Sequence, residues 1–169
     1  MAKLVSRMHG VHEAVSSSLT SPTDMSVITN SQKETEDFGI KLSQKLKGGD
    51  ILLLSGELGA GKTSLVKGLG FGLGIKNELT SPTFTLMNVY EFNNKQLTIN
   101  KLVHIDTYRL KDEKELIEIG VEDYLGEPDT VCVIEWPEKI VGLLKNTKII
   151  TIELAHGEKS NQRKISIKK

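Results

Sequence analysis

The residues best suited to chemistry in this chain form one motif of eight, Gly56-Glu57-Leu58-Gly59-Ala60-Gly61-Lys62-Thr63. It follows the G-x-x-x-x-G-K-[ST] pattern of a phosphate-binding P-loop. Glycines let the backbone turn tightly and point its N–H groups at phosphate oxygens. Lys62 would place an ammonium beside the β- and γ-phosphates, and the Thr63 hydroxyl would bind Mg²⁺. Ser64 follows in the next helix, whose N-terminal end attracts the same anion. The motif therefore predicts a nucleotide-binding site.

Two apolar segments end in carboxylates that could complete such a site. Residues 102–105 lead to Asp106, and residues 131–134 lead to Glu135. A ligand-binding acid beside a P-loop belongs at the C-terminal edge of a buried strand. With two acids near one polyphosphate, one could help hold the metal while the other positions a water. The residues alone do not decide which acid has which role, and either acid could instead be a helix cap or a surface side chain.

A loop threonine is the third candidate. Thr83 lies in the polar, Pro-bearing segment 78–84, downstream of the P-loop helix. A threonine in such a loop can move in to meet Mg²⁺ and the γ-phosphate, as switch loops do. A plain turn residue is the alternative.

These residues need a framework of strands and helices to bring them together. Residues 51–54 are an apolar run that predicts a buried strand feeding the P-loop, and leucines four apart over 63–73 predict the helix after it. Ser31 and Glu34 fit a capping box that opens an earlier helix. Further elements are a hairpin (84–92 and 97–105), a helix beyond residue 112, a strand (131–134) and a final pair of strands (149–152 and 164–167). The order predicts an α/β fold, a P-loop NTPase-like three-layer sandwich with a mixed sheet and an antiparallel hairpin insert.

Composition and length predict a single domain. The chain has 169 residues, no net charge and a pI near 6.9, so its bulk electrostatics favour neither nucleic acid nor a membrane surface. No apolar stretch approaches the length of a membrane span. Residues 1–24 are rich in serine and poor in acids, which predicts a disordered leader or extension before a single P-loop ATPase domain at 25–169. We expect the basic cluster near the end to be a solvated edge strand; it comprises Lys159, Arg163, Lys164, Lys168 and Lys169.

The sequence gives little indication of cysteine chemistry or of a histidine metal site. Cys132 lies in an apolar run and is expected to be a core residue, and a single cysteine without an internal disulfide suits a reducing cytosol. A metal site made of histidines needs paired ligands at short spacing. The four histidines are scattered instead, at His9, His12, His104 and His156.

Three other functions remain open for a P-loop protein. A small-molecule kinase needs fixed cations to stabilise the transferred charge, and of Arg7, Arg109 and Arg163 only Arg109 is near a motif. A GTP-binding switch commonly uses Asn-Lys-x-Asp, and the segment 94–97 lacks the aspartate. A scaffold that binds ATP without hydrolysing it would differ from a slow ATPase only in turnover. A P-loop ATPase is the leading hypothesis, and a small-molecule kinase is its main alternative.

Four sequence blocks together resemble one known family. They are the P-loop, Thr80-Ser81-Pro82-Thr83-Phe84-Thr85-Leu86, His104-Ile105-Asp106-Thr107-Tyr108-Arg109-Leu110 and Ile134-Glu135-Trp136-Pro137-Glu138. Their order and spacing are similar to those of the TsaE (YjeE) family, the small bacterial ATPases of threonylcarbamoyladenosine (t6A) modification of tRNA. The resemblance runs from about residue 29 to the end of the chain, and the three later blocks are much more specific to the family than the P-loop. The family offers no role for the N-terminal extension.

The resemblance implies roles in metal binding and catalysis. Thr63 and Glu135 would be the Mg²⁺ ligands. Asp106 would be the essential acid and Thr83 the switch-loop threonine, so that with Lys62 they form the expected catalytic group.

The resemblance also implies the nucleotide contacts and the partners. Trp136 would lie near the nucleotide, and residues 29–35, with Gln32 and Thr35, would contact the adenine side. The cofactors would be ATP and Mg²⁺. Hydrolysis would be weak in isolation and would depend on a cytoplasmic complex with TsaD and TsaB, whose catalytic cycle it resets. Contact with the tRNA, which is modified at position 37, would be indirect.

Overall fold

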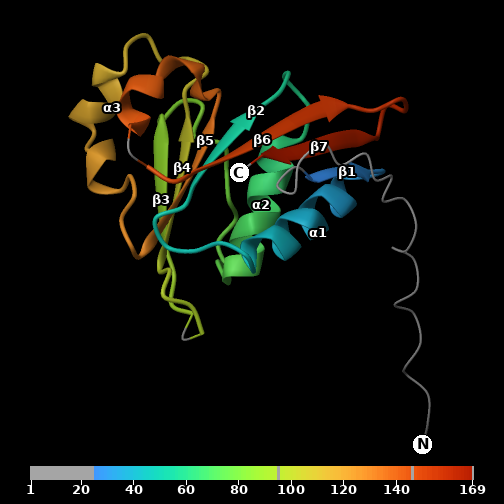
Figure 1. The fold of residues 1–169 in the computed structure, drawn as a ribbon, viewed down its shortest axis with the longest axis horizontal. Helices are drawn as coiled ribbons and strands as arrows, with labels where there is room; N and C mark the ends of the chain where they lie inside the picture. Colours follow the sequence, from blue (N-terminus) through green and yellow to red (C-terminus); the bar gives the residue numbers. More distant parts are fainter. Residues whose placement is uncertain (1–24, 95, 146, 169) are drawn as a thin grey trace, which may run out of the picture.

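A computed structural model describes residues 25–94, 96–145 and 147–168, so the predicted leader at 1–24 lies outside the described residues. Seven strands form one sheet in the order β1-β7-β6-β2-β5-β4-β3 (Figure 1). The strands are β1 (Met25–Thr29), β2 (Ile51–Ser55), β3 (Met87–Glu91), β4 (Lys101–Asp106), β5 (Thr130–Glu135), β6 (Ile149–His156) and β7 (Arg163–Lys168). The α-helices are α1 (Gln32–Ser43), α2 (Lys62–Leu73) and α3 (Lys114–Glu118), and the short 3₁₀ helices are η1 (Val121–Asp123), η2 (Pro137–Lys139) and η3 (Val141–Leu144).

The sheet is mixed, as predicted. Strands β6, β2, β5 and β4 form a parallel centre. Antiparallel strands flank it on both sides, with β3 against β4 and the pair β7 and β1 beyond β6. The hairpin insert is therefore confirmed as β3 and β4, although both strands are shorter than predicted. Residues 84–86 stay in the preceding loop, where Leu86 has a left-handed backbone with φ of 64°.

Each face of the sheet carries its own layer. Helices α1 and α2 pack against one face, and α3 with the 3₁₀ helices covers the other, which confirms the three layers (Figure 1). Side chains alternate along β2 accordingly, because Leu52 and Leu54 join the core under α1 and α2, whereas Ile51 joins the opposite core. Helix α1 begins at the predicted capping box, where the Glu34 N–H donates to Ser31 Oγ at 3.1 Å.

Strand β1 was not recognised in the sequence, and this makes one prediction wrong. The basic segment at the end is not an edge strand, because β7 lies between β6 and β1. Lys164 and Lys168 are exposed on it, while Ile165 and Ile167 are buried. In the part of the chain that the structure describes, no helix is long and apolar enough to cross a membrane.

Candidate functional site

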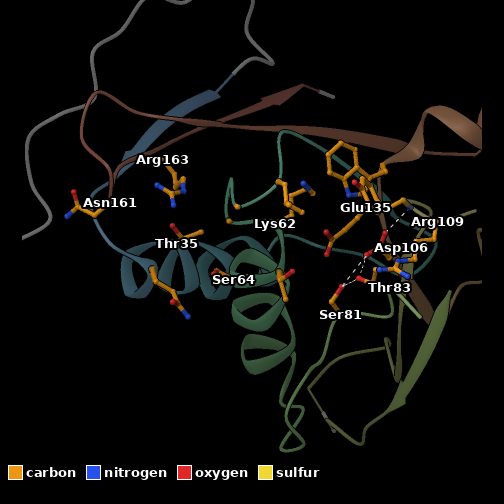
Figure 2. A pocket seen from close by; sticks show the side chains of 17 residues that line it. Thr35, Lys62, Ser64, Ser81, Thr83, Asp106, Arg109, Glu135, Asn161 and Arg163 are labelled. Atoms are coloured by element: carbon orange, nitrogen blue, oxygen red, sulfur yellow. Dashed lines mark hydrogen bonds between the residues drawn. The ribbon is translucent and has the colours of Figure 1, made fainter. Parts of the chain in front are cut away.

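A cleft of about 820 Å³ lies at the C-terminal edge of the parallel strands. It has two ends with the P-loop between them. Figure 2 shows Thr35, Asn161 and Arg163 at one end, Lys62 in the middle, and a cluster at the other end. The cluster contains Ser81, Thr83, Asp106, Tyr108, Arg109, Glu135 and Trp136. The sequence-predicted residues of the P-loop, the loop before β3 and both strand ends are therefore in one cleft.

The P-loop connects β2 to α2 and takes the shape that its glycines permit. Gly56 has φ of +140°, and a Cβ there would lie 2.2 Å from the Leu154 carbonyl oxygen. Gly61 begins α2 with φ of +99° and no side-chain cap, so the N–H groups of the first helical turn are open to an anion. Of the eight motif residues, five line the cleft: Leu58, Gly59, Gly61, Lys62 and Thr63. Ser64, also predicted to contact the nucleotide, lines it as well.

The three remaining motif residues, Gly56, Glu57 and Ala60, are not among the residues that line the cleft. Ala60 is fully buried in the core under α1 and α2. Gly56 and Glu57 offer their carbonyl oxygens to Lys62, whose ammonium donates to them at 2.7 and 3.0 Å. They shape the loop and hold its lysine.

Lys62 is buried and strongly influenced by its surroundings. Burial lowers the pKa of its ammonium, against the opposing attraction of Glu135, Asp106 and Glu138, which raises it. The ammonium lies 4.0 Å from the centre of the Trp136 ring, a cation–π contact. A cation held this way, with few water contacts, is well placed to bind phosphate oxygens.

Asp106 and Glu135 are the last residues of neighbouring parallel strands and stand opposite each other in the β4–β5 register. Both are almost fully buried. Asp106 Oδ2 accepts hydrogen bonds from Thr83 Oγ1 at 2.7 Å and Ser81 Oγ at 3.2 Å. Asp106 Oδ1 accepts one from the Tyr108 N–H at 2.9 Å. Both of its oxygens are therefore engaged by the two loops that flank it.

Trp136 is held at the cleft by an unusual backbone. Its φ of 60° is rare for a residue that is not glycine and is retained where the surroundings enforce it. The Thr107 hydroxyl donates to the Trp136 carbonyl oxygen, and the Trp136 N–H donates to Leu54 O at 3.1 Å. The ring also packs against Tyr108, with centroids 5.2 Å apart. This geometry sets the indole ring over the Lys62 ammonium at the edge of the cleft.

The opposite end of the cleft is built by segments far apart in the sequence. Gln32 and Thr35 come from α1, Asn161 comes from the turn between β6 and β7, and Arg163 is the first residue of β7. The Asn161 side chain donates to Asn30 O at 2.6 Å, which fixes this turn against the start of α1. A Cβ on Gly61 would lie 3.6 Å from Arg163 Cγ, so the arginine lies directly beside the P-loop.

The family model "Threonylcarbamoyl adenosine biosynthesis protein TsaE" matches residues 29–165. The chain belongs to the TsaE family. Its relatives include proteins named "tRNA threonylcarbamoyladenosine biosynthesis protein TsaE". That of Treponema pallidum is 41% identical over 120 residues, covering 71% of this chain and 84% of its own. The Rickettsia typhi protein is 38% identical over 141 residues, which cover 83% of this chain and 92% of the Rickettsia protein. The crystal structure of Bacillus subtilis YdiB superposes with a TM-score of 0.64 at 28% identity, covering 85% of this chain and 84% of its own.

In this TsaE-family chain, sequence reasoning missed several residues of the site. Ser81, Tyr108 and Arg109 lie inside the blocks that identified the family, yet no role was predicted for them. The sequence places Arg163 only in the basic cluster predicted as an edge strand, gives no signal for Asn161, and shows His104 as one of four scattered histidines.

His104 is in fact part of the carboxylate cluster. Its Nε2 lies 2.9 Å from Glu135 Oε1, and both side chains are buried. Its position two residues before Asp106 on β4 was the available signal, because side chains two apart on a strand share a face. That face is the one under α2.

The donor set fits Mg²⁺ bound together with a nucleotide. Among the described residues, no group of three or more His, Cys, Asp or Glu side chains forms a metal cage. Mg²⁺ on a nucleotide needs only one or two protein oxygens, because phosphates and water supply the other ligands. Thr63, Asp106 and Glu135 all line the cleft and offer such oxygens. In this TsaE-family site, Glu135 keeps one carboxylate oxygen without a hydrogen bond from the described residues, which suits it to the metal.

Proposed function

We propose that this chain is a Mg²⁺-dependent P-loop ATPase that serves t6A modification of tRNA in the cytoplasm, as a regulatory subunit of a complex with TsaD and TsaB. One observation carries the enzymatic part: Lys62 and two buried strand-end acids, Asp106 and Glu135, meet in a single cleft. Membership of the TsaE family supports the pathway, because the relatives are named for tRNA threonylcarbamoyladenosine biosynthesis.

The cleft orients ATP along its length. The adenosine lies at the end formed by Gln32, Thr35, Asn161 and Arg163, and the triphosphate lies over the P-loop. The N–H groups at the start of α2 and the Lys62 ammonium bind the phosphates. The γ-phosphate then reaches the end that holds Asp106 and Glu135.

Hydrolysis requires a positioned water and stabilisation of developing charge. Thr63 and Glu135 hold Mg²⁺, which when bound neutralises charge on the phosphate oxygens. Asp106 accepts a hydrogen bond from the attacking water and orients it. Ser81 and Thr83 at present donate hydrogen bonds to Oδ2, so a shift of the loop of residues 78–86 would free this oxygen for the water. A partner that moves this loop would then raise the rate, and turnover by the chain alone would be slow.

Action through a protein complex agrees with the charge of the chain. Direct binding to RNA relies on many lysine and arginine contacts with phosphates. The chain has 22 basic and 22 acidic residues, so its net charge gives no such attraction. We therefore place the tRNA on the partners.

The test measures release of phosphate from ATP with Mg²⁺, for the chain alone and with purified TsaD and TsaB. Slow turnover that rises on mixing, and that is lost in Lys62→Ala, supports the proposal. Fast turnover without partners, or no response to them, overturns the regulatory role. Transfer of phosphate to a small-molecule acceptor in place of water would establish the kinase alternative.

A further inference from the structure

The one carboxylate in the cleft that keeps an open oxygen is held by a buried histidine. His104 lies on β4 and pairs in register with Val133, two residues before Glu135 on β5. Its side chain therefore projects on the same face as that of Glu135. The ring is fully buried, and Nε2 lies 2.9 Å from Glu135 Oε1. Since an ionised carboxylate only accepts hydrogen bonds, Nε2 carries the proton in this contact.

The other ring nitrogen of His104 lies in an unfavourable environment. His104 Nδ1 is buried and has no hydrogen-bond partner among the described residues. Buried polar atoms are nearly always paired, so an unpaired one in a core needs an explanation. Along β4 the neighbours of His104 on this face are Leu102 and Asp106, and across the sheet they are Val133 on β5 and Asn88 on β3. The Asn88 side chain bonds to Thr80, Thr85 and Tyr90 and leaves Nδ1 of His104 without a partner in the described part of the chain. A histidine at this position can donate an N–H to Glu135, whereas an aliphatic residue has no donor to offer.

The two acids differ in how they are held. Both oxygens of Asp106 accept hydrogen bonds from the loops beside it. Glu135 accepts one, on Oε1, from His104. Glutamate has one more rotatable side-chain bond than aspartate, so without this bond its carboxylate would sample several orientations.

We infer that His104 is a positioning residue: its Nε2–H fixes Oε1 of Glu135 and so presents Oε2 to Mg²⁺. The inference rests on the proposed function, in which Glu135 is a metal ligand. Partners of metal-binding side chains act this way generally, and their loss lowers metal affinity by about 10–100-fold. His104 itself is not among the residues that line the cleft.

The test compares two amide variants of nearly equal chemistry. In His104→Gln the amide nitrogen reaches the position of Nε2, whereas in His104→Asn it reaches only that of Nδ1. ATP binding is measured by calorimetry, first in EDTA and then in a Mg²⁺ titration. We expect all three proteins to bind ATP equally in EDTA. With Mg²⁺, His104→Gln should remain within about twofold of the parent, and His104→Asn should need about tenfold more Mg²⁺.

A structural role for His104 would give a different result. It would lower the melting temperature of both variants and leave the Mg²⁺ dependence unchanged, and that outcome overturns the inference. In a Glu135→Ala background, His104→Asn should cause no further loss of Mg²⁺ affinity, because the residue acts through Glu135. A further tenfold loss there would also overturn it. Failure of the proposed function is distinguishable, because the parent itself would then show no Mg²⁺-dependent binding of ATP.

Discussion

The Thr83 hydroxyl donates its only hydrogen to Asp106 Oδ2, at 2.7 Å. This bond ties the loop of residues 78–86 to the end of β4 and keeps the threonine away from the P-loop. Thr83 and Asp106 are therefore coupled: breaking their hydrogen bond would free both the Thr83 hydroxyl and Asp106 Oδ2 for other partners.

Replacing Asp106 should separate binding from chemistry. In Asp106→Asn we expect ATP affinity close to that of the parent, because the phosphates bind mainly to the P-loop. Turnover in the presence of the partners should fall by about 10²–10⁴-fold, the usual contribution of a positioned acid or base. Calorimetry and a phosphate-release assay measure the two quantities. A variant that unfolds, or that turns over normally, would show that the acid is structural.

Removing the P-loop lysine should weaken binding itself. Lys62→Ala loses one charge-assisted contact with phosphate, which costs about 1.5–3 kcal/mol, or roughly 10–150-fold in the dissociation constant of ATP. Lys67→Ala is the matched control, since Lys67 is on the same helix and makes only a long, exposed ion pair with Glu78 at 3.8 Å. If both variants bind ATP alike, the P-loop assignment fails.

The pH dependence of binding should follow the same lysine. Burial lowers the pKa of Lys62 from the usual 10.5 in the free protein. Only the charged form attracts phosphate, so ATP affinity is complete below this lowered pKa and falls as pH rises through it. The decline should therefore begin at a lower pH than for an exposed lysine. Dissociation constants measured between about pH 7 and 10 check this. The same slope in Lys62→Ala would assign the decline to another group.

The single cysteine should be inert in the native protein. Cys132 is buried on β5, as its apolar surroundings predicted, and burial raises the pKa of its thiol to about 12. The reactive thiolate is then a minute fraction at pH 8. Mass spectrometry after iodoacetamide treatment should show an unmodified native chain and complete modification in denaturant. Rapid labelling of the folded protein would mean that β5 opens readily.

The close contact between α1 and α2 should depend on Gly68, which has no Cβ. A Cβ on Gly68 would lie 2.0 Å from the Glu36 carbonyl oxygen, so alanine there forces the helices apart. We expect Gly68→Ala to lower the free energy of unfolding by about 1–3 kcal/mol, despite the better helix propensity of alanine. Urea denaturation measures this change, with Lys67→Ala as the neighbouring control. Equal stability of the two variants would refute tight packing at this point.

The features of this molecule that the sequence predicts are those formed by residues close together in the chain or placed by a general rule of sheet topology. Lys62 and Thr63 are contiguous with the glycines that place them, so the P-loop could be recognised directly. Asp106 and Glu135 could be paired because parallel strands end at the same edge of a sheet. Their placement in one cleft needed only that rule.

Features that depend on long-range pairing could not be found the same way. The bond between His104 and Glu135 requires the register of β4 against β5, which no local pattern reveals. Arg163 lies beside the P-loop because β7 pairs with β6 on one side and β1 on the other, and β1 is five residues long with no turn joining it to its partner. The same pairing explains why the basic segment was wrongly predicted as an edge.

The pairing of β1 with β7 also bears on when the cleft comes into being. The P-loop and both acids are made well before Asn161 and Arg163, which line the other end of the cleft. A nascent chain stopped before residue 161 therefore has a P-loop but an open-ended cleft. If ATP binds along this cleft as proposed, translation must pass the β6–β7 turn before the nucleotide can be held along its whole length, and tight binding of ATP would report that β7 has been synthesised and docked.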